Sequence, residues 1–357
     1  MPRDKLDQRS GERVKRIRIP ALLVAAAALA AVVLAACGGS SSSSSSSGGG
    51  GNGGQVSLVA YSTPQEAYQQ IIPSFQRTSA GKGVTFKQSY GASGDQERSV
   101  EAGLPADVVA LSLTPDVNKL VKAELVAPNW NADRYHGFVT NSVVVFLVRK
   151  GNPKHIQTWD DLVKPGVQVV TPNPFTSGGA RWNTIAAYGA QLAQGRSDAQ
   201  AIAYLNQLFA KNVVAQDKSA RESLQTFTSG KGDVALSYEN EAITAQQKGE
   251  DVDYVIPKQT ILIQNPTAVT SDTKNPSAAK AFRDYLWTPA AQKVFVAKGY
   301  RSVLPSLQDK AKFPVPPQLF TIDKLGGWSK VNDRFFDPQK GVLVDVEMSM
   351  GFATAMS

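Results

Sequence analysis

The segment GVQVVTPNPFTSGGARWNTIAAYG, residues 166–189, decides the fold class of this chain. It begins with an apolar stretch typical of a buried strand, continues through small and hydroxyl residues, and ends in a helical pattern. The same order of strand, short junction and helix recurs from Gln55 onward. Strands that alternate with helices predict an α/β fold with mostly parallel sheets.

Other strands and helices follow from the same patterns. Strands are predicted at 56–61, 84–91, 106–112, 142–149, 166–172, 233–238 and 252–257, and helices near 180–195, 198–211, 220–230 and 277–298. Thr63 is expected to be the N-cap of an earlier helix, with Pro64 at its first position and Glu66 completing a capping box. About 285 residues of this pattern are too many for one core, so two lobes are expected.

The N-terminus has the order of an export signal. Basic residues end at Arg18, an apolar run ends at Ala36, and Cys37 follows. Leu34-Ala35-Ala36-Cys37 resembles a bacterial lipoprotein box, so residues 1–36 are interpreted as a signal peptide and Cys37 as the lipidated residue. The alternative is a retained transmembrane helix, but the run is shorter than the roughly 20 residues that span a bilayer.

Residues 37–54 are interpreted as the lipidated cysteine and a flexible tether. Positions 38–54 contain only Gly, Ser and Asn, a composition that cannot bury enough apolar surface to form a core. The folded part would then lie outside the cytoplasm, held at the outer face of the cell membrane by lipid alone.

Charge and rare residues exclude several classes of protein. Of the formal net charge of +8, residues 1–36 hold +4, from seven basic and three acidic residues, so the remainder is only mildly basic. It has no basic run interleaved with aromatics, which disfavours nucleic acid as a partner. Cys37 is the sole cysteine, and the two histidines, His136 and His155, are far apart. We therefore expect no intramolecular disulfide, no metal site and no cofactor.

Four junctions between a strand and a helix combine hydroxyl side chains with small residues. They are Ser62-Thr63-Pro64, Gly91-Ala92-Ser93-Gly94, the segment 174–183, and Lys218-Ser219-Ala220-Arg221-Glu222. Small residues let an anion approach the backbone, and the first turn of a helix offers unpaired N–H groups and a partial positive charge. Together these junctions suit a fully ionised oxyanion held by uncharged groups.

The alternative at each junction is an ordinary helix N-cap, because Ser and Thr are common there. The junction at Ser177-Gly178-Gly179 contains more than a cap needs, since each glycine in a helix costs about 1 kcal/mol relative to alanine. It is the strongest candidate for a binding segment.

Several segments resemble the periplasmic sulfate-binding protein family. They are SYGASGDQERSV (89–100), ADVVALS (106–112), VVVFLVRKGNPKHIQTWDDLVKPGVQVVTPNP (143–174), PNPFTSGGARWNTIAAYG (172–189), YENEA (238–242) and FTIDKLGGW (320–328). The resemblance covers about 55–335 and implies the two-lobed type II periplasmic-binding-protein fold with the ligand in the cleft between lobes. It also implies a monomer that binds sulfate, and possibly thiosulfate, for the permease and ATPase subunits of an ABC importer.

The resemblance implies lobe limits as well. Lobe 1 would comprise 55–140 and 262–340, and lobe 2 would comprise 141–261. The tail 341–357 differs from the ending usual in the family, and its role is left open.

The resemblance also implies ligand contacts in this sequence. Backbone N–H groups would come from Ser62, Ser93, Gly178, Gly179 and Ala220, and hydroxyl groups from Ser93 and Ser177. The last donor is usually a Trp indole, but position 238 is Tyr238, whose phenol can donate one hydrogen bond. Molybdate-binding relatives have a tyrosine there.

Arg181 falls four residues after Ser177, beneath the first helical turn. We interpret it as a supporting residue behind the ligand, paired with Asp116 across the cleft. The alternative is a solvated surface arginine.

A pocket of uncharged donors would select a ligand by its protons. Sulfate accepts every hydrogen bond, whereas hydrogen phosphate carries a proton that would find no acceptor, at a cost of about 1–3 kcal/mol. The alternatives are another oxyanion such as molybdate, suggested by Tyr238, and a serine-dependent ester hydrolase. An enzyme is disfavoured because the sequence lacks a nucleophile with a base or a metal cluster.

Overall fold

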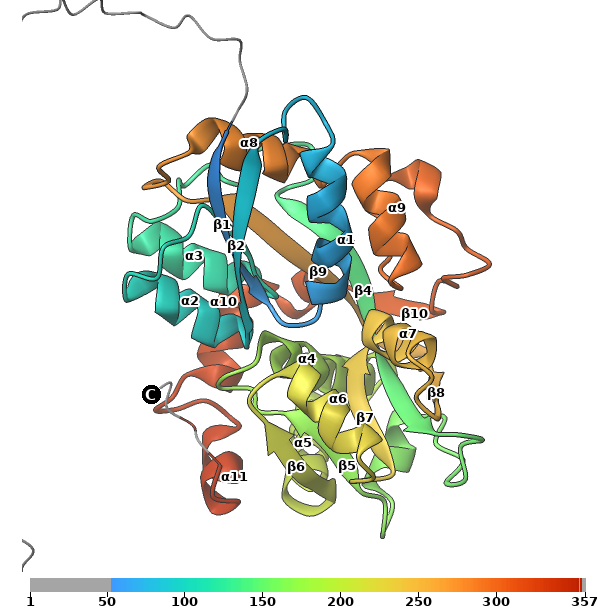
Figure 1. Ribbon diagram of the computed structural model, residues 1–357. Coiled ribbons are helices and arrows are strands. Elements are labelled where there is room, and N and C mark those ends of the chain that lie inside the picture. The colour runs from blue at the N-terminus through green and yellow to red at the C-terminus, as the bar shows by residue number, and fades with distance from the viewer. Residues whose placement is uncertain (1–52, 353, 355–357) are drawn as a thin grey trace, which may run out of the picture. The chain divides into compact units, whose positions relative to one another are not determined.

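Two long strands, β4 (Phe138–Arg149) and β9 (Gln259–Val269), connect the two halves of the sheet in the computed structural model (Figure 1). The structure describes residues 53–352 and 354. The strand order is β2-β1-β3-β9-β4-β7-β5-β6, with β10 beside β9 and β8 beside β4. We call β2, β1 and β3 the first half of the sheet, and β7, β5, β6 and β8 the second half.

The remaining strands are β1 (Gly54–Tyr61), β2 (Val84–Gly91), β3 (Val108–Ala110), β5 (Val169–Pro172), β6 (Val213–Asp217), β7 (Val234–Tyr238), β8 (Val252–Val255) and β10 (Gln318–Phe320). The α-helices are α1 (Gln65–Gln76), α2 (Ser93–Glu101), α3 (Thr114–Lys122), α4 (Gly178–Ala193), α5 (Asp198–Gln207), α6 (Ala220–Thr228), α7 (Glu239–Gln247), α8 (Pro276–Tyr285), α9 (Pro289–Ala297), α10 (Gly327–Val331) and α11 (Val344–Ser349). Short 3₁₀ or π segments lie at Trp159–Val163, Leu208–Asn212, Pro305–Leu307, Ile322–Leu325 and Asn332–Phe336.

The sheet is mixed rather than mostly parallel. Strand β1 runs parallel to β2 and β3, and β5 runs parallel to β6 and β7. Strand β9 is antiparallel to β3 and β4, and β4 is antiparallel to β7 and β8. The predicted lobe limits at 140/141 and 261/262 fall inside β4 and β9, where the sheet passes from one half to the other. The division into those lobes remains a prediction.

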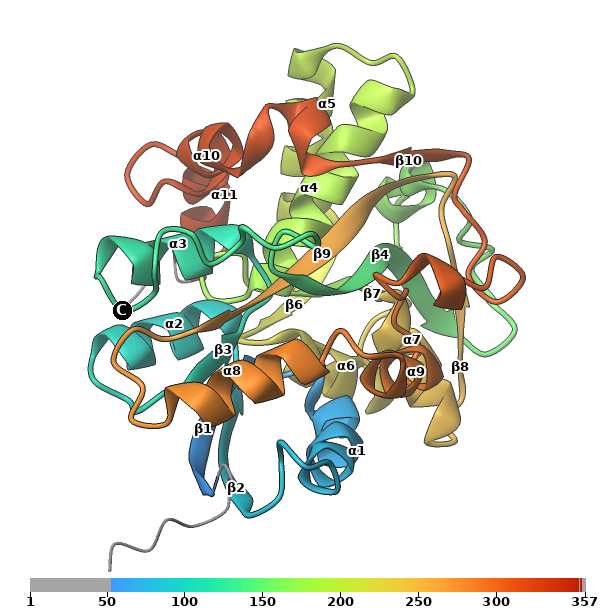
Figure 2. The same ribbon diagram turned by 90° about the horizontal axis from the view of Figure 1, so that it is seen from above.

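Helices cover both faces of each half of the sheet, as burying both faces of parallel strands requires. In the first half, α1, α8 and α9 pack on one face around Phe75, Phe282 and Phe295 (Figure 2), and α3 packs on the other through Leu120. In the second half, α4 and α5 pack around Trp182 and Tyr204, and α6 and α7 around Phe227 and Ala242. The C-terminal Leu343 and Val344 join the core beside α4 and α5.

The structure corrects two expectations about helices. Helix α1 begins at Gln65 without a side-chain cap. The hydroxyl of Thr63 lies 3.1 Å from that of Tyr300, and the Glu66 carboxylate accepts hydrogen bonds from Arg221, so distant partners replace the predicted capping box. The predicted helix at 277–298 is two helices, because Thr288 caps α9 by accepting a hydrogen bond from the Ala291 N–H.

The predicted signal peptide 1–36, Cys37 and residues 38–52 of the tether lie outside the described residues. Gly54, placed in the tether by sequence, is the first residue of β1. Among the residues that the structure does describe, there is no helix with the length and apolar character to cross a membrane.

Candidate functional site

The predicted junctions surround one small cavity of about 10 Å³. It lies where the chain leaves β1, β2 and β7 and where helices α2, α4 and α6 begin. Its lining consists of Tyr61, Ser62, Thr63, Gly91, Ala92, Ser93, Ser112, Ser177, Gly179, Ser219, Ala220 and Tyr238. The first and second halves of the sheet both contribute residues to it.

Three helix N-termini meet at this cavity. Helix α2 starts at Ser93, α4 at Gly178 and α6 at Ala220. The first turn of a helix has N–H groups without helical acceptors and carries about half a positive charge. No residue of the described lining carries a formal charge. The cavity is therefore electropositive and offers hydrogen-bond donors without any cationic side chain, which suits a small anion.

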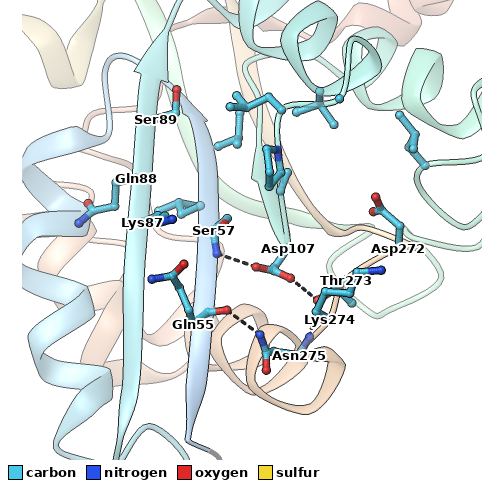
Figure 3. A pocket seen from close by; sticks show the side chains of 18 of the residues that line it. Gln55, Ser57, Lys87, Gln88, Ser89, Asp107, Asp272, Thr273, Lys274 and Asn275 are labelled. Carbon is cyan, nitrogen blue, oxygen red and sulfur yellow. Dashed lines mark hydrogen bonds between the residues drawn. The ribbon is translucent and has the colours of Figure 1, made fainter. Parts of the chain in front are cut away.

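A larger hollow of about 880 Å³ lies elsewhere, beside β1, residues 87–89 of β2 and the segments 103–107 and 272–275 (Figure 3). Its buried carboxylate, Asp107, accepts hydrogen bonds from the Ser57 N–H at 2.7 Å and from the Thr273 hydroxyl. Asn275 donates to the Gln55 carbonyl at 2.8 Å. These polar groups hold the surrounding segments together, and among the described lining residues the only helix start is Asn275, the N-cap of α8. Three helix starts meet at the small cavity, which is therefore the better candidate site.

Of the residues predicted to contact a ligand, Ser62, Ser93, Ser177, Gly179, Ala220 and Tyr238 line the cavity. Gly178 does not. A Cβ at Gly178 would lie 2.7 Å from Oγ of Ser112 and 2.9 Å from Cγ of Leu113, closer than real side chains approach. Gly178 is thus required for the packing of α4 against the chain after β3, a role that the sequence did not indicate.

Ser177 and Ser219 occupy equivalent positions at two of the helix starts. The Ser177 Oγ accepts from the Ala180 N–H at 3.3 Å, and the Ser219 Oγ accepts from the Glu222 N–H at 3.2 Å. Both residues are therefore helix N-caps as well as cavity residues. A hydroxyl that accepts in this way keeps its own proton for a ligand.

The hydroxyl of Ser93 is not available in the way that was predicted. It donates to Oδ2 of Asp116 at 2.6 Å and accepts from the Ser112 N–H at 2.9 Å. Because a hydroxyl has one proton, Ser93 can offer a ligand its backbone N–H but not its hydroxyl in this arrangement.

Tyr238 ends β7 and is almost completely buried. Its hydroxyl lies 2.7 Å from Oγ of Ser112. Burial raises the pKa of Tyr238 well above its ordinary value, so the phenol keeps its proton and can donate it. Sequence reasoning missed Ser112, since it is simply the last residue of a predicted strand and precedes no cap or glycine run.

Arg181 is buried beneath the cavity, not solvated. Its Nε donates to the Pro174 carbonyl at 2.9 Å, its Nη1 to Asn332 at 3.3 Å, and its guanidinium lies over the Phe336 ring at 5.1 Å. Within the described part of the chain it forms no ion pair with Asp116, because that carboxylate accepts from Ser93 instead. Burial lowers the pKa of Arg181, and the nearby charge of Asp116 opposes this effect.

Arg221, next to Ala220, was also missed. Its guanidinium contacts Oε1 and Oε2 of Glu66 at 2.6 and 2.8 Å and Oε1 of the buried Glu241 at 3.1 Å. Lys248 also contacts Glu66. Although burial alone would raise it, these hydrogen bonds hold the pKa of Glu66 at about 2. The charged side chains beside the cavity thus pair with one another, and among the described lining residues only uncharged donors face the cavity.

Among the described residues of the lining there is no histidine or cysteine and no carboxylate to activate a serine. Across the described residues, no group of three or more His, Cys, Asp or Glu side chains could hold a metal ion. The chemistry that this cavity supports is the binding of an anion by hydrogen bonds.

Known proteins resemble the chain over most of its length. The sulfate-binding protein of Synechococcus elongatus is 48% identical over 293 residues, which cover 79% of this chain and 83% of that protein. The thiosulfate-binding protein of Escherichia coli is 35% identical over 298 residues, covering 78% and 86%. The solved structure of the sulfate-binding protein SubI from Mycobacterium tuberculosis H37Rv is 44% identical, with a TM-score of 0.77, and covers 79% of this chain and 99% of that one.

A family model described as bacterial extracellular solute-binding protein matches residues 56–301. The two-lobed α/β fold of periplasmic binding proteins and the relationship to the sulfate- and thiosulfate-binding proteins, both predicted from the sequence, are confirmed. The chain belongs to the family of bacterial extracellular solute-binding proteins.

Proposed function

We propose that this protein binds sulfate, and thiosulfate as a second ligand, outside the cytoplasm. The observation that carries the proposal is the meeting of three helix N-termini, those of α2, α4 and α6, at one cavity without a charged lining residue. The relatives at 48% and 35% identity, named for sulfate and for thiosulfate, support the same ligand class.

The donors would hold the anion from several sides. Backbone N–H groups of Ser62, Ser93, Gly179 and Ala220 and hydroxyls of Ser177 and Tyr238 would point at its oxygens. Each hydrogen bond to a charged acceptor is stronger than one between neutral groups, and the helix ends favour negative charge in their first turn. A sulfate dianion could accept from all of them without a counter-ion.

Selectivity would follow from the lack of a carboxylate in the lining. Hydrogen phosphate brings a proton that needs an acceptor, and the cavity offers hydroxyl oxygens but no charged one. An unmet hydrogen bond in a buried site costs about 1–3 kcal/mol, so phosphate is expected to bind about 5- to 150-fold more weakly than sulfate.

Calorimetry with sulfate, thiosulfate, molybdate and phosphate on the purified full chain in detergent tests the proposal. We expect binding of sulfate and thiosulfate, with phosphate much weaker. Molybdate is the alternative ligand, favoured by the phenol of Tyr238 at the edge of the cavity. If molybdate binds most tightly, the preferred ligand is molybdate and not sulfate. If the protein binds none of the four anions, the oxyanion-binding function is refuted.

We also propose that the protein is a monomer that delivers its ligand to the permease and ATPase subunits of an ABC importer. The segment up to Cys37 supports anchoring through lipid at the outer face of the membrane. Labelled palmitate should be incorporated into the protein in bacterial cells, and Cys37→Ala should lose both the label and retention in the membrane fraction. Equal labelling of the variant would contradict the anchor.

A further inference from the structure

We propose that Ser112 is a positioning residue for the oxyanion, which it serves by directing the phenolic proton of Tyr238 into the cavity. The inference rests on the proposed function, because it concerns the same cavity. Ser112 lies two residues after β3, in the first half of the sheet, and Tyr238 ends β7, in the second half. Their hydroxyl contact of 2.7 Å therefore joins the two halves at the site.

The backbone of Ser112 is fixed by three hydrogen bonds. Its N–H donates to Oγ of Ser93 at 2.9 Å, and its carbonyl accepts from Nε1 of Trp182 at 3.1 Å and from Nδ2 of Asn265 at 3.2 Å. These partners lie on α2, α4 and β9. Ser112 is 1% exposed, so its position is set by protein groups and not by water.

The side chain of Ser112 has little freedom either. The start of α4 lies directly over it, and a Cβ at Gly178 would come within 2.7 Å of its Oγ and 2.8 Å of its Cβ. The glycine at this helix start thus leaves space for the Ser112 hydroxyl. The oxygen of the Ser112 hydroxyl is therefore held beside the Tyr238 hydroxyl, at 2.7 Å.

The two hydroxyls share one hydrogen bond and have two protons. When Ser112 donates to Tyr238, the phenolic proton is left to point into the cavity. When Tyr238 donates to Ser112, the phenol presents a lone pair to the cavity, which repels an anion. A bound dianion selects the first arrangement, and a hydroxyl that accepts a hydrogen bond becomes a better donor. Ser112 therefore strengthens and orients the hydrogen bond from Tyr238 to the ligand.

A double-mutant cycle separates this role from a structural one. The sulfate affinity of the full chain is measured for the unmodified protein, Ser112→Ala, Tyr238→Phe and the double variant. We expect Ser112→Ala to weaken binding about tenfold and Tyr238→Phe by ten- to a hundredfold. We expect the double variant to match Tyr238→Phe within about twofold, because Ser112 acts through the phenol.

A matched control is the Ser74 and Tyr285 pair, whose hydroxyls lie 2.8 Å apart and away from the cavity. Ser74→Ala should leave the affinity unchanged. If thermal unfolding shows that Ser112→Ala does not fold, Ser112→Cys takes its place in the cycle, because a thiol of similar size is a weak donor.

The positioning role would be overturned if Ser112→Ala lowered sulfate affinity equally in the unmodified protein and in Tyr238→Phe, or if it did not lower the affinity of the unmodified protein. Either result would leave the proposed function intact. Failure of the unmodified protein to bind sulfate, thiosulfate or molybdate would overturn both proposals.

Discussion

Arg221 and Glu66 form a bidentate ion pair beside the cavity, with Nη1–Oε1 and Nη2–Oε2 distances of 2.6 and 2.8 Å. Arg221 lies in α6 and Glu66 in α1, so the pair joins the helices of the two halves of the sheet. Both side chains are mostly buried, at 16% and 17% exposed. A pair of this kind stabilises the arrangement in which both halves contribute donors to one anion.

Glu66→Gln is expected to weaken sulfate binding about tenfold, or about 1.4 kcal/mol, mainly through faster dissociation. The variant keeps Glu241 as a partner for Arg221, so no buried charge is left alone. Stopped-flow measurement of ligand release checks the rate. Asp284→Asn, which removes an exposed ion pair with Lys280 on α8, is the control and should release sulfate at the unmodified rate. Equal release rates for Glu66→Gln and the unmodified protein would contradict a role of the pair in ligand retention.

The adjacent glycines at the start of α4 should respond differently to alanine. A Cβ at Gly179 would lie 3.3 Å from the Ala220 Cβ, 3.4 Å from Oγ of Ser177 and 3.6 Å from Cε1 of Tyr238, beside the cavity. Gly179→Ala should therefore lower sulfate affinity at least tenfold with little loss of stability. Gly178→Ala should lower the free energy of unfolding by about 1–3 kcal/mol, because its Cβ would overlap Ser112. Calorimetry measures the sulfate affinity of both variants, and urea unfolding measures their free energy of unfolding. Equal changes of affinity and of stability in the two variants would contradict the prediction.

Ser177 and Ser197 cap α4 and α5 in the same way, but only Ser177 is a cavity residue. Each Oγ accepts from the backbone N–H three residues later at 3.3 Å. Either serine changed to alanine should reduce the free energy of unfolding by about 1 kcal/mol. Ser177→Ala should also weaken sulfate binding by more than tenfold, while Ser197→Ala should bind normally. Comparable losses of affinity in both variants would indicate that the Ser177 hydroxyl acts only as a cap.

Glu347 in α11 gives the protein a pH dependence of stability. It is fully buried, one oxygen accepts from Gln216 at 2.8 Å, and the other has no partner within the described residues. Burial raises its pKa to about 7. The folded state therefore holds this proton more tightly than the unfolded state, and stability falls as the pH rises from about 4.5 to 7 and then levels off.

The loss should be roughly 2 kcal/mol for Glu347, measured by urea unfolding between pH 5 and 8. Glu347→Gln should remove this part of the pH dependence, because an amide does not titrate in this range. The amide can also donate a hydrogen bond to the unpartnered Oε1 of Gln216. A residual slope is expected from Glu97, whose pKa burial also raises to about 7. A variant with the same slope as the unmodified protein would contradict the assignment.

The local patterns predicted much of the fold. The strand expected at 84–91 has those bounds in the structure, and the glycine-rich segment does lead into α4. Strand β9 was not predicted, because Asn265 and Thr267 interrupt its apolar pattern. These side chains are nevertheless buried, and Asn265 donates to the Ser112 carbonyl and accepts from Thr140. A sequence pattern cannot show partners that are more than a hundred residues away.

The candidate site was predictable where its signal was local. Ser177 and Gly179 stood out because small and hydroxyl residues preceded a helix. Ser112 and Arg221 did not stand out, since a serine at the end of a strand and an arginine in a helix are common. What distinguishes them is their set of partners in the folded chain, which neither composition nor spacing contains.

Strands β4 and β9 carry the chain between the two halves of the sheet as an antiparallel pair, in which β4 exchanges its pairing with β9 for pairing with β7 after Val143. A swing of one half against the other would have to bend these paired strands. Two paired strands that connect the halves would resist twisting and sliding of one half against the other and permit bending about one axis. Each opening and closing would then return the donors of both halves to the same alignment.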